Sequence, residues 1–556
     1  MSFDRRKLLK LLTFGTGVGV AIGSGISAVG AEGATPSVED VQGARFGPPV
    51  PFDFDRLKDH ARAIAAKPYV EPAIADAAVL DKIDYSNHAK IWFLEKFGVW
   101  RGEEEPGPVH FFHPGTFFKD PVRIHVVEAG TARQVLPSSD AFGYPEGHPA
   151  GSLTHPPAYA GFKLLNKGTF TDWLSFIGKS YFRSSGPFDQ YGLSARGILI
   201  DAGLPTPEEF PRFSEFWLED HETFFVIHAL LEGESLAGAY RMEVRGGHDT
   251  IMDVSLSLYA RKDIKRLGIA PLTSMYWYSE DHRQRAVDWR PEIHDSDGLL
   301  MRNGYGETLW RPLNNPPRIM TNSFSDQSPR GFGLIQRDRA FTSYADPALA
   351  YNKRPSAWVE PLSDWGKGVV QLLEIPTDDE IHDNIGAYWV PDEPLRKADE
   401  RSFRYRLSWI DQAHREQNGA SDHPARVLAS RSGTGGIPEQ ARPDATRRFV
   451  IDFEHDADAG IPTDALPEAR ISASRGQILR QFVVPGSENG AAGENAIWRL
   501  VFDLKAEGTD ALDLRADLIW KSKTISETWI YQTFPATWPN AADEKPVEKS
   551  ITPTTQ

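Results

Sequence analysis

The chain has 556 residues, of which 40% are hydrophobic and 25% charged, and its 61 Lys and Arg against 77 Asp and Glu give a formal net charge of -16. This composition is typical of a globular protein, and the negative charge opposes binding to nucleic acid or to an anionic membrane. The absence of cysteine excludes disulfides, thiolate zinc sites and cysteine nucleophiles.

Residues 1–31 have the pattern of an export signal. Arg5 and Arg6 lead a basic start, and residues 11–29 are apolar but rich in glycine. The arginine pair is typical of twin-arginine export, and small residues fit cleavage after Ala31. An uncleaved membrane anchor is the alternative, which the glycines disfavour. We therefore predict a periplasmic protein with no membrane insertion after signal cleavage.

The next segment, up to about residue 390, is mostly β in pattern. Two short helices are predicted at 53–66 and 73–83, where apolar residues recur at helical spacing. Another helix is predicted at 173–178. Short alternating or β-branched segments between Gly, Pro and Asp turns predict strands at 90–94, 122–128, 224–231, 239–244, 251–259 and 369–375. The pattern indicates a large antiparallel sandwich over residues 32–392.

A polar, proline-bearing stretch around residue 395 predicts a domain boundary. Its composition is typical of a linker, which we place at 393–401. A second, immunoglobulin-like sandwich is predicted at 402–540, and a disordered tail at 541–556. The strands predicted for this domain are 404–409, 447–453, 477–484, 496–504 and 512–520.

Several catalytic motifs are absent. The chain has no P-loop, no dinucleotide fingerprint and no nucleophile elbow outside the export signal. Its histidines are scattered rather than spaced as zinc ligands, although distant residues could still form a metal site. We therefore expect neither a metal nor a cofactor.

Two acidic loops beside aromatic segments are more informative. One spans residues 292–298 and the other residues 378–384. Glycoside cleavage needs one carboxylic acid to protonate the leaving oxygen and one carboxylate to activate water, with flat side chains against the sugar. The alternative is two solvated turns, in which Asp, Asn and Gly are common for local reasons. The pattern alone favours the turns, because acidic loops are frequent and the distance between two carboxylates is not visible in a sequence.

Long strings in the chain resemble one family, the periplasmic glucan biosynthesis proteins G and D. They are FHPGTFFKDPVRIHVVE (112–128), GKSYFRSSGPFDQYGLSARGILID (178–201), PLTSMYWYSE (271–280), RPEIHDSDGLLMRNGYGETLWRPL (290–313), GFGLIQRDRAFTSYADPALAYNKRPSAWVEP (331–361) and LLEIPTDDEIHDNIGAYWVP (372–391). Together they span most of the mature chain, and the twin-arginine pattern is more similar to the D branch.

The resemblance implies an all-β protein, with a galactose-mutarotase-like supersandwich followed by an immunoglobulin-like domain. It implies a β-1,2-linked glucan as ligand, and inverting β-1,2-glucanase or related transglycosylase activity. Asp383 in HDN would be the general acid and Asp295 in HDSDG the general base. Tyr351 would hold a network of water and sugar hydroxyls. Glu380, which lies close to Asp383 in the sequence, is the fourth residue predicted for catalysis.

Further polar and aromatic residues are candidates for sugar subsites, because glucan binding combines stacking with hydrogen bonds to hydroxyls. For each of them a place in the core is the alternative. They are Arg302, Trp310, Arg311, Tyr276, Trp277, Trp358 and Trp365.

Two functions other than catalysis are also considered for this chain. A non-catalytic glucan-binding protein that presents or shapes nascent chains would need the same cleft, and a purely structural envelope protein would bind no ligand. A homodimer is plausible from the resemblance, although nothing in the sequence itself indicates one.

Overall fold

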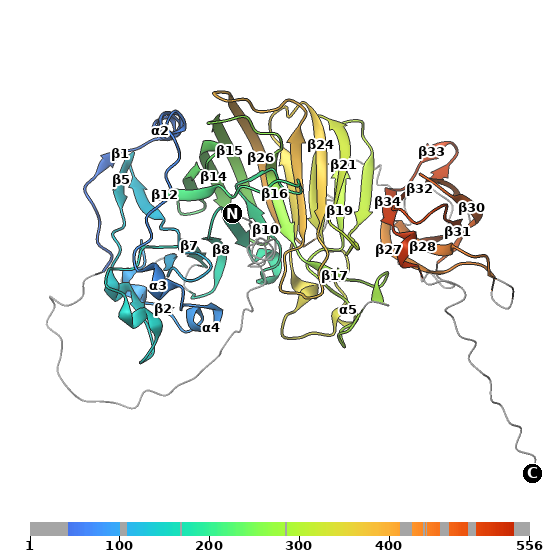
Figure 1. Ribbon diagram of the computed structural model, residues 1–556, viewed down its shortest axis with the longest axis horizontal. Coiled ribbons are helices and arrows are strands. Elements are labelled where there is room, and N and C mark those ends of the chain that lie inside the picture. Colours follow the sequence, from blue (N-terminus) through green and yellow to red (C-terminus); the bar gives the residue numbers. More distant parts are fainter. Residues whose placement is uncertain are drawn as a thin grey trace, which may run out of the picture. The chain divides into compact units, whose positions relative to one another are not determined.

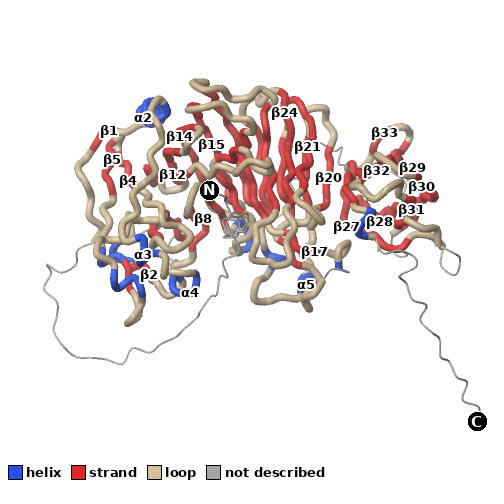
Figure 2. The backbone as a smooth tube through the Cα atoms, in the orientation of Figure 1, coloured by secondary structure: helices blue, strands red, loops and turns tan. Residues whose placement is uncertain are grey.

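The computed structural model describes residues 43–100, 108–166, 169–283, 286–411, 425–437, 440, 442–455, 466–486 and 496–538. These residues are almost entirely strands and loops, which confirms the predicted all-β class (Figure 1, Figure 2). The predicted signal at 1–31 and the tail at 541–556 lie outside them. Within the described ranges no helix is long and apolar enough to span a membrane.

The chain forms two compact units. The first comprises Met1–Trp277, Ile293–Gly306 and Ile319–His414. The second comprises Tyr278–Glu292, Glu307–Arg318 and Arg415–Gln556.

Two sheets make up most of the first unit. In one sheet the strand order is β1 (Val50–Pro51), β5 (Thr131–Gln134), β4 (Arg123–Glu128), β12 (Arg212–Asp220), β13 (Phe225–Glu232), β14 (Leu236–Arg245), β15 (Thr250–Ala260), β26 (Glu400–Ile410), β23 (Ser356–Pro361), β22 (Gly331–Ile335) and β19 (Gly298–Arg302). In the other it is β21 (Met320–Gln327), β24 (Lys367–Glu374), β25 (Ile385–Pro391), β16 (Leu267–Ser274), β10 (Ser194–Arg196), β9 (Tyr181–Ser184), β8 (Asp172–Ile177), β7 (Gly161–Leu165) and β3 (Val109–Phe112), with β11 (Ile198–Ile200) beside β16. Two small sheets pair β2 (Trp92–Phe93) with β6 (Phe142–Gly143) and β17 (Tyr276–Tyr278) with β18 (Ile293–His294).

Aromatic side chains join the inner faces of these two sheets. Phe162 of β7 packs against Phe216 of β12 with ring centroids 5.1 Å apart, and Phe182 of β9 contacts Trp409 of β26 at 6.1 Å. Burial alternates along most of β15, whereas every residue of β16 is buried. β15 therefore has one open face, and β16 is covered on both faces.

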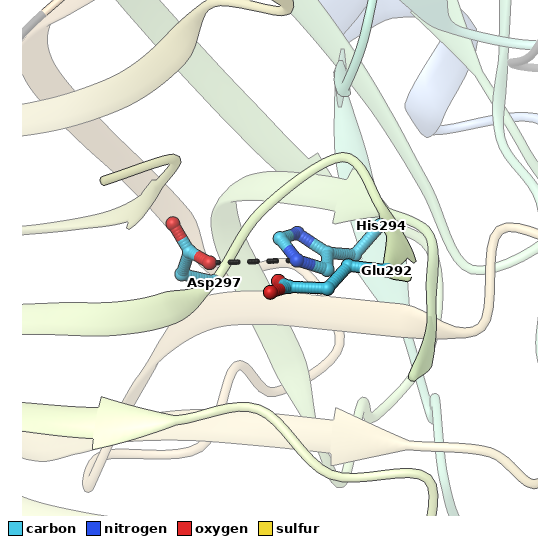
Figure 3. Close-up of side chains that lie close together, drawn as sticks. All are labelled: Glu292, His294 and Asp297. Atoms are coloured by element: carbon cyan, nitrogen blue, oxygen red, sulfur yellow. Dashed lines mark ion pairs between the residues drawn. The ribbon is translucent and has the colours of Figure 1, made fainter. Parts of the chain in front are cut away.

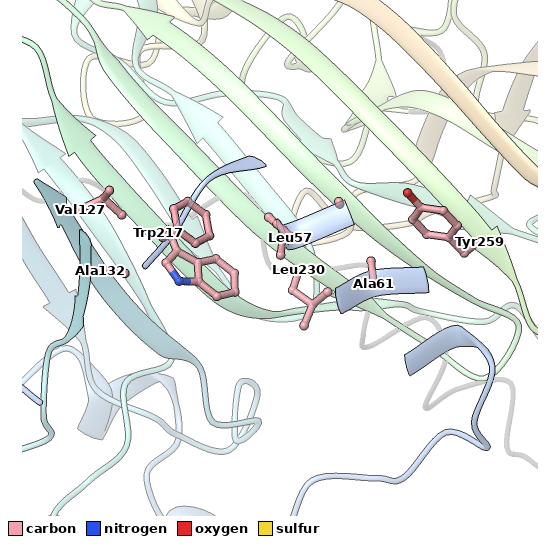
Figure 4. Close-up of a cluster of buried hydrophobic side chains, with 9 residues drawn as sticks. Leu57, Ala61, Val127, Ala132, Trp217, Leu230 and Tyr259 are labelled. Carbon is pink, nitrogen blue, oxygen red and sulfur yellow. The ribbon is translucent and has the colours of Figure 1, made fainter. Parts of the chain in front are cut away.

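The predicted helix at 53–66 is confirmed as α2 (Phe54–Ala65), which begins where the Asp53 side chain accepts a hydrogen bond from Arg56 N at 2.8 Å. Its apolar residues Leu57 and Ala61 pack on the first sheet near Leu230 (Figure 4). The helix predicted at 73–83 is a shorter one, α3 (Ala77–Leu80). Two other short helices are α4 (Tyr85–His88) and α5 (Phe341–Tyr344).

Two predictions about this unit need correction. Residues 173–178 were expected to be helical, but β8 occupies 172–177 and pairs with β7 and β9, because sheet pairing decides a short apolar segment. The boundary at 393–401 also differs from the structure. β26 starts at Glu400 and pairs with β15 and β23, so the polar stretch connects strands of two sheets in the same unit.

The second unit contains two layers of strands, one of four strands and one of five. One has the order β27 (Arg426–Thr434), β28 (Thr446–His455), β31 (Ala496–Lys505) and β30 (Gln477–Pro485). The other has the order β20 (Thr308–Pro312), β34 (Thr528–Thr533), β32 (Leu512–Trp520) and β29 (Glu468–Ala473), with β33 (Lys523–Thr524) beside β32. Phe449 and Phe502 of the first layer contact Trp529 of the second. The immunoglobulin-like topology stays a prediction.

Candidate active site

Asp295 follows β18 directly and has a fully buried side chain, with 0% exposed. Its backbone N donates to Met275 O at 2.8 Å, and its Oδ1 accepts a hydrogen bond from the Arg354 guanidinium. Its Oδ2 has no hydrogen-bond partner among the described residues. Burial raises the pKa of this carboxyl, and the charge of Arg354 opposes the rise.

Asp383 lies between the end of β24 and the start of β25, and it is 5% exposed. Burial raises its pKa to about 7, and the negative charge of Asp295 adds to the rise. Arg183 and Arg354 act in the opposite direction. The backbone of Asp295 bonds to Met275, and Asn384, next to Asp383, bonds to the adjacent Tyr276, so the two predicted acids belong to one site. Asp383 Oδ2 also lacks a hydrogen-bond partner in the described part of the chain.

Asn384 fixes the position of the neighbouring Asp383. Its Oδ1 accepts from Tyr276 N at 2.8 Å, and its Nδ2 donates to the carbonyls of Tyr276 and Ile375, both at 2.9 Å. These bonds attach the Asp383 segment to the start of β17 and the end of β24. A buried amide with three backbone contacts leaves little freedom to the backbone beside it.

Tyr351 and Arg354 lie beside Asp295. The guanidinium carbon of Arg354 lies 3.9 Å from the centre of the Tyr351 ring. The Tyr351 hydroxyl donates to the Glu380 carboxylate. Burial raises the pKa of this hydroxyl far above its usual range, so it remains a donor at physiological pH.

Gln336 connects the segments that carry His294 and Tyr351. Its Oε1 lies 3.0 Å from His294 Nδ1, and its Nε2 donates to Tyr344 Oη at 2.7 Å and to Tyr351 O at 3.3 Å. His294 Nε2 in turn lies 3.5 Å from Asp297 Oδ1 (Figure 3). His294 and Asp297, which flank Asp295 at one and two residues, are therefore held by side-chain contacts.

The structure thus brings together all four residues predicted for catalysis. It distributes the predicted sugar-binding residues more widely. Tyr276 is buried beside the site, with its ring 5.6 Å from that of His294, and Trp277 is half-buried. Arg302 of β19 lies over Trp358 of β23 at 5.9 Å.

The remaining three candidates lie elsewhere. Trp365 packs among Trp389, Phe403 and Tyr405, so its buried ring is part of the aromatic core. Trp310 and Arg311 belong to the second unit, where both are buried and Arg311 lies over the Tyr531 ring at 5.6 Å.

Three residues that contact or influence the candidate site were missed by the sequence analysis, namely Arg354, Gln336 and Arg183. Arg354 stands three residues after Tyr351 within a string quoted above, and a carboxylate that is buried in the fold needs a cation nearby. Gln336 and Arg183 carry no comparable signal, because their role depends on contacts between distant segments.

Comparison with known proteins shows the family of this chain. The family model described as Periplasmic glucan biosynthesis protein, MdoG, matches residues 52–533. Glucans biosynthesis protein D 2 of Ralstonia nicotianae is 44% identical, over 90% of this chain and 94% of its own length. Glucans biosynthesis protein D of Stenotrophomonas maltophilia is 42% identical, over 88% and 91% respectively. Glucans biosynthesis protein G of Rhodopseudomonas palustris is 40% identical, over 87% and 94%. The chain therefore belongs to the MdoG family of periplasmic glucan biosynthesis proteins.

Proposed function

We propose that this member of the family cleaves a β-1,2-linked glucan, as an inverting endo-β-1,2-glucanase or a related transglycosylase, and so controls the glucan backbone. Asp383 is the general acid and Asp295 the general base. The observation that carries the proposal is that each of these buried carboxyls keeps one oxygen, Oδ2, that no group in the described part of the chain contacts by a hydrogen bond. Structural carboxylates at such depth are normally saturated with hydrogen bonds.

The protonation states fit these roles. With a pKa of about 7, Asp383 carries a proton over much of the neutral range and gives it to the oxygen of the leaving sugar. The Arg354 guanidinium opposes the rise that burial causes in the pKa of Asp295, and so favours the ionised form, whose Oδ2 accepts the proton of the attacking water. The bond from the anomeric carbon to the leaving oxygen breaks as the bond to water forms on the opposite face. The proton reaches Asp295 directly or through water and a sugar hydroxyl.

A substrate can reach the two acids only if the loop that carries Glu380 moves away from them. Asp295 is completely buried, whereas Glu380 on the loop before Asp383 is half-buried. The hydrogen bond from the Tyr351 hydroxyl to the Glu380 carboxylate holds this loop against Tyr351. We expect glucan binding to break that bond, which frees the Tyr351 hydroxyl for water or a sugar hydroxyl.

The test is to incubate the mature protein with linear β-1,2-glucan and to measure new reducing ends and product size. Asp383→Asn and Asp295→Asn should each lower the rate by about 100-fold or more. Asp378→Asn, on an exposed acid of the same loop, is the matched control and should retain the wild-type rate. Glucan that binds but stays intact with the wild-type protein would refute the proposal and favour the glucan-binding function.

We also propose that the protein reaches the periplasm by the twin-arginine route. The support is the Arg5-Arg6 pattern together with membership of a family of periplasmic glucan biosynthesis. Cell fractionation should find the wild-type protein in the periplasm. The double substitution Arg5→Lys and Arg6→Lys should retain it in the cytoplasm, and unchanged export of that variant would contradict this route.

A further inference from the structure

A cavity of about 700 Å³ lies in the first unit, between the end of α2 and the start of β26. Its volume is in the range of pockets that hold a small-molecule ligand. Four alanines belong to its lining, and their small side chains leave the space open. They are Ala65, Ala66, Ala260 and Ala398. The polar stretch at 393–401, which has the composition of a linker, therefore supplies one side of this cavity.

The cavity and the two candidate acids lie beyond opposite ends of β25. This strand begins at Ile385, two residues after Asp383, and ends at Pro391, after which the chain leads to Lys397 in the cavity lining. Its seven residues span about 20 Å. In Figure 1, α2 lies at one end of the sheets and α5, which bonds to Gln336 of the candidate site, lies at the other. A ligand in the cavity is therefore separate from the catalytic groups.

The last turn of α2 is attached to two strands. Arg62 donates to both carboxylate oxygens of Glu400 at the start of β26, at 2.6 and 3.1 Å. Arg261, just after β15, donates to the backbone carbonyls of Ile64 and Lys67 at the end of the helix. These contacts set the shape of the cavity before a ligand arrives, which lowers the entropy cost of binding.

The turn before β26 has a strained backbone. Ala398 has a φ of 68°, in the left-handed region that residues other than glycine rarely adopt. The backbone N of Ala398 donates to Ala260 O, and the backbone N of Ala260 donates to Asp399 O, both at 3.0 Å. Strain of this kind persists only where the surrounding structure maintains it, and it clusters at ligand sites.

Tyr69 offers an aromatic ring to the cavity. It is half-buried, and its ring has no aromatic or cationic partner in the described part of the chain. Pro68 and Pro72 restrict the backbone on either side of it. The ring of Tyr259, by contrast, is buried and lies under the Arg62 guanidinium at 5.0 Å. Tyr69 is therefore the ring available for stacking against a sugar.

The charged groups of the lining are nearly balanced in sign. Five are basic and four acidic, in a chain whose formal net charge is -16. Lys262 pairs with Glu234 at 3.2 Å. Three others form no ion pair within the described ranges, and they are Lys67, Lys397 and Glu71. An ionic ligand would meet like charges as well as opposite ones, whereas the hydroxyls of a neutral sugar can use donors and acceptors together.

We propose that this cavity is an accessory binding site for β-1,2-glucan, which holds a short segment of the chain away from the catalytic groups. Tyr69 stacks on a sugar ring, and the charged groups around the cavity bond to sugar hydroxyls. A glucan long enough to reach both sites gains affinity from the second contact. The choice of ligand rests on the proposed function, whereas the cavity and its lining do not.

The alanines allow a direct test in solution. The mature Asp383→Asn protein, used to prevent cleavage, is labelled at alanine and methionine methyl groups and titrated with a short linear β-1,2-gluco-oligosaccharide. We expect the signals of Ala66 and Ala398 to report the cavity, and that of Met275, whose carbonyl bonds to Asp295, to report the catalytic site. Adding Tyr69→Ala should weaken binding at the cavity about tenfold and leave the Met275 response unchanged.

Val70→Ala is the matched control, because Val70 is the next residue but is 80% exposed and outside the lining. It should keep both responses. A response of Met275 without one of the alanines would overturn the inference and leave the proposed function intact, and an unchanged alanine response in Tyr69→Ala would also overturn it. Responding alanines in a protein whose wild type cleaves no glucan would support the site and refute the proposed function.

Inorganic phosphate is the second probe, because the unpaired lysines could instead serve an anion. We expect the Ala66 and Ala398 signals to stay unchanged at phosphate concentrations equal to those of the oligosaccharide. A response to phosphate at lower concentration than to the oligosaccharide would overturn the assignment of a neutral ligand.

Discussion

The side chain of Asn384 and the backbone of Tyr276 form a reciprocal pair of hydrogen bonds, at 2.8 and 2.9 Å. Met275, the residue before Tyr276, accepts the backbone N–H of Asp295 at 2.8 Å. One stretch of two residues therefore holds the segments of both candidate acids, which are far apart in the sequence. The spacing of Asp295 and Asp383 depends on this stretch more than on either loop.

Asn384→Ala tests that dependence. The substitution leaves three backbone groups of Tyr276 and Ile375 buried without their partner, so we expect the free energy of unfolding to fall by about 3 kcal/mol. We also expect kcat to fall more than KM changes, because Asp383 loses its fixed position. Urea unfolding and steady-state kinetics measure the two effects. A variant with wild-type kcat would show that Asn384 does not position the acid.

The raised pKa of Asp383 also predicts a dependence of stability on pH. The folded protein holds this proton up to about pH 7, whereas the unfolded chain releases it near its ordinary value of 3.8. Stability is therefore lost as pH rises from about 4 to about 7, by about 4 kcal/mol at most. Asp383→Asn removes this loss.

Urea unfolding of both proteins at pH 4 and pH 8 makes the comparison. The asparagine variant should gain stability relative to the wild type as the pH rises. A difference between the two proteins that does not change with pH would mean that Asp383 titrates normally in the folded state.

Removal of Arg354, the cation beside Asp295, should raise the pKa of the proposed base. In Arg354→Met the opposing positive charge is lost, so the pKa of Asp295 rises further and ionisation needs a higher pH. The acidic limb of the kcat/KM profile should move to higher pH, and the variant should be less stable by about 3 kcal/mol because a buried charge loses its partner. The double variant with Asp295→Asn should recover much of that stability and none of the activity. An unmoved acidic limb would contradict the assignment of Asp295 as base.

The contact between Tyr351 and Glu380 gives a prediction about access. If this hydrogen bond closes the loop over the acids, Tyr351→Phe and Glu380→Gln both weaken the closed state, and the double variant adds little to either. We expect Tyr351→Phe to lower kcat more than Glu380→Gln, since only the former removes the hydroxyl offered to water or sugar. Additive effects in the double-mutant cycle would show that the two residues act independently.

The fold was largely predictable where local pattern and tertiary structure agree. The helical spacing at 53–66 and the alternation at 251–259 both match the structure. The segment at 173–178 was wrong because a short apolar run fits either state, and only its neighbours β7 and β9 decide between them. The polar stretch at 393–401 has the composition of a linker, but it is a surface connection between β25 and β26.

The site was predictable only in part, for a similar reason. Asp295 and Asp383 could be named because they stand in recognisable strings. The partner of Asp295, Arg354, is 59 residues away, and the partner of Tyr276, Asn384, is 108 residues away. Contacts between residues so far apart in the sequence depend on which strands pair and how the sheets pack. A single sequence does not specify either. The burial of Trp365 in an aromatic cluster is a consequence of the same pairing.

The most direct test of the account is the anomeric form of the first product released from linear β-1,2-glucan, followed by proton NMR from the start of the reaction. The account predicts that new reducing ends appear first as the α-anomer and reach the equilibrium mixture only later, because water attacks opposite the leaving group. The Asp378→Asn control should give the same course, and Asp383→Asn should give almost no product. A first product in the β-form would contradict an acid and base acting across an attacking water, and glucan with neither new reducing ends nor any change in chain length would contradict the enzyme itself.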